Sequence, residues 1–234
     1  MLAPKYSDEL YFSGNKIEQV QIQKDLGKIV SDDLKWIYHI KTATKKALGV
    51  FFMLKRSSPK LNPSTKLNLY KSMVLPILIY GSSCWFANVE SCKLLENVQK
   101  RCLKWISYSN NSNYKELLQK NGILPLSLYM QLLDILLLSK VFEGYFDFDP
   151  TAFVTVRRPT RELRTSDQIL FEHGKRNLHI CEQSFFTRTT NLVNRLPQHI
   201  RFGEITGLKQ RLLSYLWDHF QTEYNEIVSS TWRI

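Results

Sequence analysis

Apolar residues recur every three or four positions along most of the chain, which is the period of an amphipathic helix. The first such stretch runs from Leu34 to about Arg56, and Ser31-Asp32-Asp33 before it supplies a hydroxyl and carboxylates suited to a helix N-terminus. Pro76 lies inside a second stretch and predicts a kink, because proline lacks the N–H that an internal helical turn needs. The same period predicts further helices at 64–77, 94–106, 114–120, 126–143, 187–196 and 206–221.

The first thirty residues follow a different pattern, with short apolar runs separated by turn residues. Ser13-Gly14-Asn15 separates Tyr11-Phe12 from the apolar positions of 17–22, an arrangement typical of a hairpin. The run 26–30 predicts a short strand with Gly27 inside it, and a glycine in a strand often marks a close approach of another backbone.

These patterns predict a mainly α protein in three parts. Short strands at 1–33 precede a helical domain at 34–145, and a loop-rich and then helical region occupies 146–234. Residues 144–186 show no sustained period, so we expect a long loop with a few short strands there.

The most apolar stretch of the chain, 123–141, predicts a buried helix. Pro125, Gln131, Asp134 and Lys140 interrupt it, which argues against a membrane span. The chain begins without the apolar core of a signal peptide, and its four cysteines are then expected to be free thiols. We therefore expect an intracellular protein, nuclear or cytoplasmic, with no membrane partner.

Composition and charge indicate the class of partner. The 234 residues are 44% hydrophobic, which excludes wholesale disorder, and they carry a net charge of +11. Eleven basic residues and only three acidic ones lie within 24–71, so the surplus is concentrated in one block. Such a block favours nucleic acid or another polyanion, although basic residues on solvated helix faces are an alternative.

Residue types that could carry catalysis occur in unfavourable settings. Asp32-Asp33 is an adjacent carboxylate pair of the kind that binds metal ions for nucleotidyl transfer, but it opens a helix, so we expect a helix cap. The sequence holds no Cys-x-x-Cys pair and no phosphate-binding glycine loop. We expect buried thiols at Cys84, Cys92 and Cys102, while the proximity of His173, His179 and Cys181 leaves a metal site open.

The positive signal is a basic helical block with interleaved aromatic residues. Lysines and arginines contact phosphates, and aromatic rings stack on sugars or bases, although aromatics at helical spacing are also typical of a core. The aromatic residues concerned are Trp36, Tyr38, Phe51, Phe52 and Tyr70. The predicted phosphate contacts, independent of base sequence, are Lys41, Lys45, Lys46, Lys55, Arg56 and Lys60. Lys100, Arg101 and Lys104 are expected on the exposed side of the helix at 94–106.

Four strings, in the same order, resemble the reverse transcriptases of jockey- and CR1-like non-LTR retrotransposons. KDLGKIVSDDLKW at 24–36, followed by His39-Ile40, is similar to their K-D-L-G-V…L…H-I stretch. LYKSMVLPILIYG at 69–81 resembles L-Y-x-S-x-V-x-P-x-L-x-Y-G, and LENVQKR at 95–101 resembles L-E-x-V-Q-R-R. FFTRTTNLVNRLP at 185–197 is similar to F-F-x-R-x-x-x-x-W-N-x-L-P.

The resemblance implies the C-terminal part of such a polymerase. Leu26 and Gly27 would form the primer-grip turn at the end of the palm, and the helices from 34 to about 107 would form the thumb. The thumb contacts template–primer, so the implied partner is an RNA–DNA hybrid or DNA duplex, with the palm and fingers as a partner in trans. The family's magnesium-binding carboxylates lie upstream of these strings. We therefore expect no cofactor and no polymerase activity from this part alone.

Two other functions are compatible with the sequence. A helical interaction module would use the neutral-to-acidic region 111–150 to bind a protein, and it would expose apolar residues there. A retroelement relic would fold poorly because its palm partner is missing, and its strands at 10–30 would then have an unpaired edge prone to aggregation.

Overall fold

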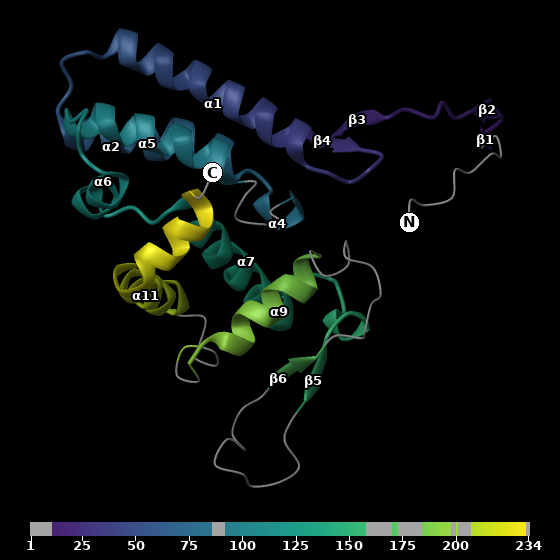
Figure 1. The fold of residues 1–234 in the computed structure, drawn as a ribbon. Helices are drawn as coiled ribbons and strands as arrows, with labels where there is room; N and C mark the ends of the chain where they lie inside the picture. Colours follow the sequence, from purple (N-terminus) through teal and green to yellow (C-terminus); the bar gives the residue numbers. More distant parts are fainter. Residues whose placement is uncertain are drawn as a thin grey trace, which may run out of the picture. The chain divides into compact units, whose positions relative to one another are not determined.

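Helices form most of the chain from Ile37 onward, and short antiparallel strand pairs precede them, which confirms the expected mainly α fold (Figure 1). The computed structural model describes residues 11–85, 92–157, 170–172, 184–197, 200 and 207–232. The chain divides into two compact units, Met1–Thr42 and Ala43–Ile234, with the boundary inside helix α1. The finer three-part division expected from the sequence stays a prediction.

The described part of the N-terminal unit, from Tyr11 onward, contains two β-hairpins. They pair β1 (Tyr11–Phe12) with β2 (Asn15–Lys16) and β3 (Ile22–Asp25) with β4 (Lys28–Ser31). Leu26 and Gly27 form the turn between β3 and β4, with φ values of 44° and 80°. Two positive φ angles are typical of a tight hairpin turn, and glycine adopts them without strain. The prediction that Gly27 lies inside a strand is therefore wrong.

The start of the first long helix also differs from the prediction. The Ser31 hydroxyl donates to Asp33 Oδ1 (2.6 Å), and the same oxygen accepts from the backbone N–H of Lys35 (3.0 Å). Leu34 has a φ of 52°, and α1 begins only at Ile37, with no acidic residue in its first turn. Asp33 therefore closes a local turn before the helix, which is a common alternative use of aspartate, and does not cap the helix.

Most helices of the second unit lie at the predicted stretches, but the last one runs to Trp232, well beyond the predicted end near 221, and the short helix at 82–85 was not predicted. The unit starts with the larger part of α1. The helices are α1 (Ile37–Ser57), α2 (Pro63–Leu69), α3 (Leu75–Ile79), α4 (Ser82–Trp85), α5 (Lys93–Ser107), α6 (Tyr114–Asn121), α7 (Leu126–Phe142), α9 (Phe185–Arg195) and α11 (Leu208–Trp232). Within the loop-rich segment lie the 3₁₀ turn η3 (Pro150–Ala152) and the antiparallel pair β5 (Thr155–Arg157) and β6 (Leu170–Glu172).

The predicted irregularity at Pro76 takes the form of a π-helical segment. This segment, η1 (Tyr70–Val74), joins α2 to α3, and Pro76 lies in the first turn of α3. The first turn of a helix has no intrahelical partner for its N–H groups, so a proline there costs no hydrogen bond. The wider π-helical turn of η1 accommodates the proline ring.

The core of the second unit is centred on α7, which is apolar around most of its circumference. Figure 1 shows α7 between α9 and α11, and it also packs against α4 and α5. The one acidic residue of this helix, Asp134, is fully buried. Arg188 of α9 donates from Nε to Asp134 Oδ2 (3.0 Å) and from Nη2 to the Ser83 carbonyl (2.6 Å). The Arg188 side chain therefore connects α9 to both α7 and α4.

A buried hydrogen-bond network joins η1, α5, α6 and the start of α7. Tyr70 donates to Gln99 Oε1 (2.5 Å), and Gln99 Nε2 donates to the Tyr114 hydroxyl (3.0 Å). Tyr114 in turn donates to Glu96, which also accepts from the backbone N–H of Ser127 (3.1 Å). Burial outweighs these hydrogen bonds and raises the pKa of Glu96 to about 7.

The described cysteines agree only in part with the expectation of buried thiols. Cys92 and Cys102 are buried free thiols as expected, whereas Cys84 is exposed, because it lies on the outer side of the short helix α4.

Within the described ranges, no helix has by itself the length and apolarity of a membrane span. The bent pair α6–α7 would meet that test jointly, but both helices contribute to the core.

Candidate nucleic-acid interface

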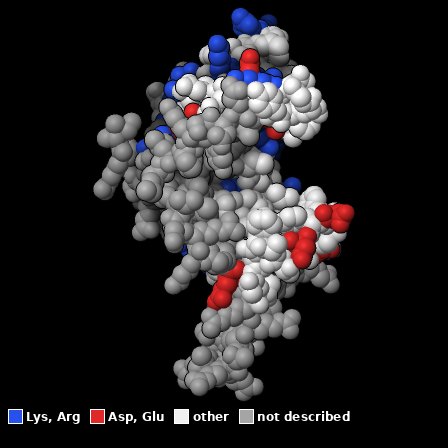
Figure 2. All heavy atoms as spheres, turned by 90° about the vertical axis from the view of Figure 1, so that its right-hand side faces the viewer, with Lys and Arg blue, Asp and Glu red and all other residues white. Residues whose placement is uncertain are grey.

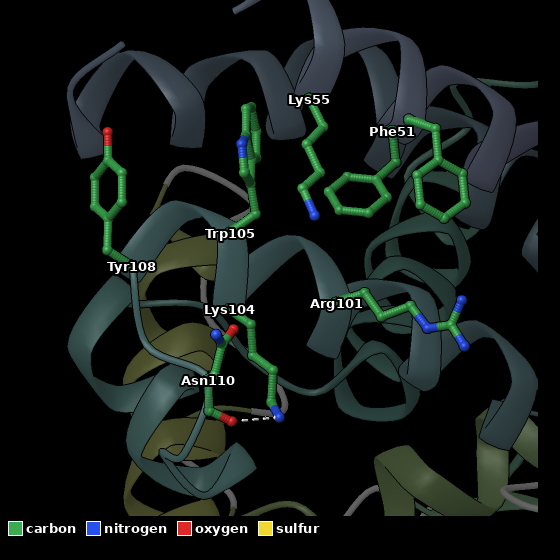
Figure 3. Close-up of a pocket in the computed structure, with 8 residues that line it drawn as sticks. Phe51, Lys55, Arg101, Lys104, Trp105, Tyr108 and Asn110 are labelled. Atoms are coloured by element: carbon green, nitrogen blue, oxygen red, sulfur yellow. Dashed lines mark hydrogen bonds between the residues drawn. The ribbon is translucent and has the colours of Figure 1, made fainter. Parts of the chain in front are cut away.

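A cleft of about 490 Å³ lies between the C-terminal half of α1 and α5 (Figure 3). We refer to it as the α1–α5 cleft. Four aromatic side chains line it: Phe51, Phe52, Trp105 and Tyr108. The other lining residues are polar or charged: Lys55, Arg101, Lys104 and Asn110. All of these residues belong to the second compact unit.

The helical period of α1 divides its aromatic residues between the core and the cleft. Phe51 faces the core, and its ring meets the Trp105 ring edge to face with centroids 5.9 Å apart. Phe52, rotated by about 100° around the helix, is 45% exposed, and Lys55 follows Phe51 by one turn. Figure 3 shows the Lys55 side chain extending from α1 into the cleft, toward α5. The wall of the cleft contributed by α1 is therefore both aromatic and cationic.

Lys66 of α2 supports the cleft from inside the protein. Its side chain is buried, and the ammonium lies 3.6 Å from the centroid of the Tyr108 ring and 4.8 Å from that of Trp105. It also donates to the Trp105 carbonyl (3.4 Å). Two aromatic faces and a carbonyl thus replace the carboxylate that a buried lysine usually requires. Lys66 holds the two rings at fixed positions.

Tyr108 occupies a backbone conformation that is unusual for a bulky residue. It follows the last turn of α5 in the left-handed region, with a φ of 51°. Its hydroxyl donates to the Leu61 carbonyl (2.5 Å), yet the side chain is 62% exposed. A left-handed residue at a helix C-terminus is commonly glycine, and a non-glycine residue there carries strain of about 1 kcal/mol or more. The conformation places a large, accessible ring at the end of the cleft.

The charge of the cleft is positive and locally unbalanced. Lys55 and Arg101 are exposed, and Lys104 donates to the Asn110 carbonyl (2.7 Å). None of these three side chains forms an ion pair with a carboxylate in the described part of the chain. Exposed carboxylates gather after α7 and in β6, at Glu143, Asp147, Asp149 and Glu172. Figure 2 shows acidic side chains over the lower half of the face that it presents.

The predicted phosphate contacts occupy different places. Lys55 lines the cleft, and Lys45, Lys46 and Arg56 are exposed on the same helix, α1. Lys60 is exposed in the connection from α1 to α2. Lys41 is exposed on the first part of α1, within the N-terminal unit, and the same unit contains the exposed turn of Leu26 and Gly27. Their roles in binding stay predictions.

The sequence prediction omitted the contribution of α5 to the site. Arg101 and Lys104 were expected to be exposed, but the sequence gives no indication that they lie opposite Lys55. The available signal was Trp105 and Tyr108 beside those cations, at spacings that fit one side of a helix. Among the five interleaved aromatic residues, Phe52 and Tyr38 are exposed, whereas Phe51 and Tyr70 are buried.

The candidate metal ligands do not form a site in the described ranges. Asp33 is held by Ser31 and Lys35, and these hydrogen bonds lower the pKa of its carboxyl to about 2. The described residues contain no group of three His, Cys, Asp or Glu side chains suited to a metal ion. His173, His179 and Cys181 lie outside the described residues.

Neither a protein-family model nor a curated protein nor a solved structure matches the chain.

Proposed function

We propose that this protein binds nucleic acid through the α1–α5 cleft, independently of base sequence. The observation that carries the proposal is the set of three cations, Lys55, Arg101 and Lys104, beside exposed aromatic rings and without a paired carboxylate. Cations neutralise backbone phosphates and release counterions, and aromatic faces add stacking that every base can satisfy. A site for an acidic protein would not need the aromatic faces.

The resemblance to non-LTR reverse transcriptases supports the same proposal. On this interpretation the chain is the C-terminal part of a retroelement RNA-directed DNA polymerase, and its helices correspond to the thumb that holds template–primer. Arg101, which lines the cleft, ends the string at 95–101 that is similar to the family's L-E-x-V-Q-R-R. The bound nucleic acid would then be an RNA–DNA hybrid or a DNA duplex.

The proposal assigns no polymerase chemistry to these residues. In the family, magnesium is held by carboxylates of a Tyr-x-Asp-Asp hairpin, and that string does not occur among the 234 residues. The Asp32-Asp33 pair does not fit the metal either, because Asp33 accepts hydrogen bonds from Ser31 and Lys35 and pairs with the Lys35 ammonium (3.2 Å). Nucleotide addition would require the palm and fingers in trans.

The direct test is the salt dependence of binding to a 12-base-pair RNA–DNA hybrid. For wild-type protein, we expect the logarithm of the association constant to fall linearly with the logarithm of salt concentration. Lys55→Gln, Arg101→Gln and Lys104→Gln together should reduce that slope by about 2 to 3, because each lost phosphate contact removes roughly 0.9.

A matched variant controls for the loss of three charges. Lys120, Lys140 and Lys209 are exposed and lie outside the cleft, so their joint change to Gln should leave the slope nearly unchanged. Equal effects of the two triple variants would contradict the proposal. Absence of binding at low salt by the folded wild-type protein would also contradict it.

A second candidate function rests on a different surface. Four aromatic side chains after α7 are exposed, and two of them, Phe148 and Phe153, form a stacked group with Phe186. The exposed residues are Tyr145, Phe146, Phe148 and Phe153. Exposed apolar residues in this region are what a protein-interaction module requires, and the acidic neighbours would favour a basic partner. This candidate gains support if the folded protein does not bind nucleic acid.

A further inference from the structure

We infer that the α1–α5 cleft takes an unpaired base, so that the chain binds single-stranded nucleic acid more tightly than a duplex. This inference rests on the proposed phosphate binding at the same site, but it assigns the cleft a different preferred ligand from the duplex that the family resemblance implies. It depends on three features of the cleft: its aromatic faces are accessible, its surface is concave, and the rings of Trp105 and Tyr108 are held in place by contacts with neighbouring residues.

The aromatic faces are accessible from the side of the cleft. Phe52 and Tyr108 both line the cleft and are 45% and 62% exposed. Figure 3 places Phe51 and Tyr108 toward opposite ends of the cleft, with Trp105 and Lys55 between them. A planar group that enters the cleft therefore meets rings on α1 and on the end of α5.

An unpaired base is the planar group that suits this geometry. In a duplex, both faces of each base are covered by neighbouring base pairs, and proteins reach only the edges. In a single strand the bases can turn outward and stack on aromatic side chains, which stabilises binding without sequence preference. The cleft is open to solvent, and its volume of about 490 Å³ leaves room for one base.

The cations of the cleft suit the phosphates on either side of such a base. Lys55 extends into the cleft from α1, and Arg101 projects from α5 on the other side (Figure 3). Lys104 is oriented by its hydrogen bond to the Asn110 carbonyl (2.7 Å). A strand that stacks one base on an exposed ring of the cleft would keep its flanking phosphates near these positive groups.

The support beneath the rings reduces the entropy lost on binding. Tyr108 is fixed by its hydrogen bond to the Leu61 carbonyl and by the Lys66 ammonium against its ring. Trp105 is fixed by contacts with Phe51 and Lys66. Since these rings are already oriented in the free protein, stacking does not require them to become ordered. The left-handed backbone at Tyr108 is strained, as is often found at ligand-binding positions.

The test compares three probes of equal length: a twelve-nucleotide thymidine strand, the same strand with abasic sites in place of every base, and a 12-base-pair duplex. The abasic strand keeps the phosphates and removes the stacking groups. We expect wild-type protein to bind the thymidine strand about 5- to 100-fold more tightly than the abasic strand. The duplex should bind more weakly than the thymidine strand at the same salt concentration.

Phe52→Ala removes one stacking face from an exposed position, so it should leave the fold intact. We expect about fivefold or greater loss of affinity for the thymidine strand and no change for the abasic strand. Phe146→Ala is the matched control, because Phe146 is 46% exposed and lies outside the cleft. It should change neither affinity, and thermal unfolding would verify that both variants fold.

The outcomes separate this inference from the proposed function. Equal affinity for the abasic and thymidine strands, or tighter binding of the duplex, would overturn the unpaired base while leaving phosphate binding in place. If no probe binds the folded protein at low salt, both the inference and the proposed function fail.

Discussion

At the scale of single residues, the most unusual groups are charged side chains in the core. Glu96, Asp134 and Lys66 are all buried, and each is compensated in a different way. Glu96 accepts hydrogen bonds from Tyr114 and from the Ser127 N–H, whereas Asp134 pairs with Arg188. A buried charge is costly unless it is paired or neutralised, so these positions should dominate the response to mutation and pH.

Glu96 should make stability depend on pH near neutrality. Burial raises its pKa to about 7 from an ordinary value of 4.5, so between these pH values the folded state binds a proton that the unfolded state has released. The free energy of unfolding should therefore decrease by about 3 kcal/mol as the pH rises from 4.5 to 7, and then level off. Glu96→Gln mimics the protonated form and should remove this decrease.

Urea unfolding at pH 5 and pH 8 measures the effect of Glu96. The difference in unfolding free energy between the two pH values should be smaller for Glu96→Gln than for the wild type. A variant that loses stability as steeply as the wild type would show that Glu96 does not titrate as described.

The Asp134–Arg188 pair should behave as a buried ion pair. Arg188→Met leaves the fully buried carboxylate without its partner and should reduce the free energy of unfolding by about 3 to 5 kcal/mol. The double variant Asp134→Leu and Arg188→Met removes both charges and should recover most of that loss. Denaturant unfolding of the two variants tests this, and a double variant as unstable as the single one would contradict it.

Several residues of the strings that carry the family resemblance take part in these buried contacts, so they have a structural role. Tyr70, Glu96 and Gln99 come from two separate strings and meet in one hydrogen-bond network. Arg188 belongs to a third string and pairs with Asp134. Those residues therefore specify how the helices pack, and among the residues of these strings Arg101 is the one that lines the cleft.

At the scale of elements, helices with a sustained apolar period were predictable and their ends were less so. The predicted ranges 94–106, 114–120 and 126–143 differ from α5, α6 and α7 by one residue at most. For α5 and α6 the period is visible in the sequence because each helix packs one face against the core, whereas α7 is visible as a long apolar run because most of its circumference is buried. The start of α1 was misplaced because Ser31 and Asp33 bond to each other and to Lys35, and sequence alone does not distinguish such a turn from a cap.

The β3–β4 hairpin offers a test of its turn. Leu26 has a φ of 44°, which asparagine tolerates better than leucine, and Asn-Gly is the preferred pair for this turn. Leu26→Asn should stabilise the hairpin by about 1 kcal/mol and slow amide hydrogen exchange in β3 and β4. Gly27→Ala, which forces a Cβ onto a φ of 80°, should accelerate that exchange. Opposite effects would contradict the assigned turn.

At the scale of the whole molecule, the concentrated charge in 24–71 was evident from the sequence, but the site was not. The α1–α5 cleft brings Lys55 opposite residues that lie more than forty positions later, and no local pattern encodes that juxtaposition. The sequence block also combined residues of two compact units, since Lys41 belongs to the N-terminal unit and Lys55 to the second. Long-range packing therefore decided which cations form the cleft.

Photocrosslinking of the protein to a single-stranded oligonucleotide containing 4-thiothymidine tests most directly where nucleic acid binds. Mass spectrometry of the digested complex would identify the attached residues. We expect attachment within residues 51–55 of α1 and 101–110 at the end of α5, with strong reduction in the Lys55→Gln, Arg101→Gln and Lys104→Gln variant. Attachment confined to other segments, or unchanged in that variant, would contradict the proposal that the α1–α5 cleft binds nucleic acid.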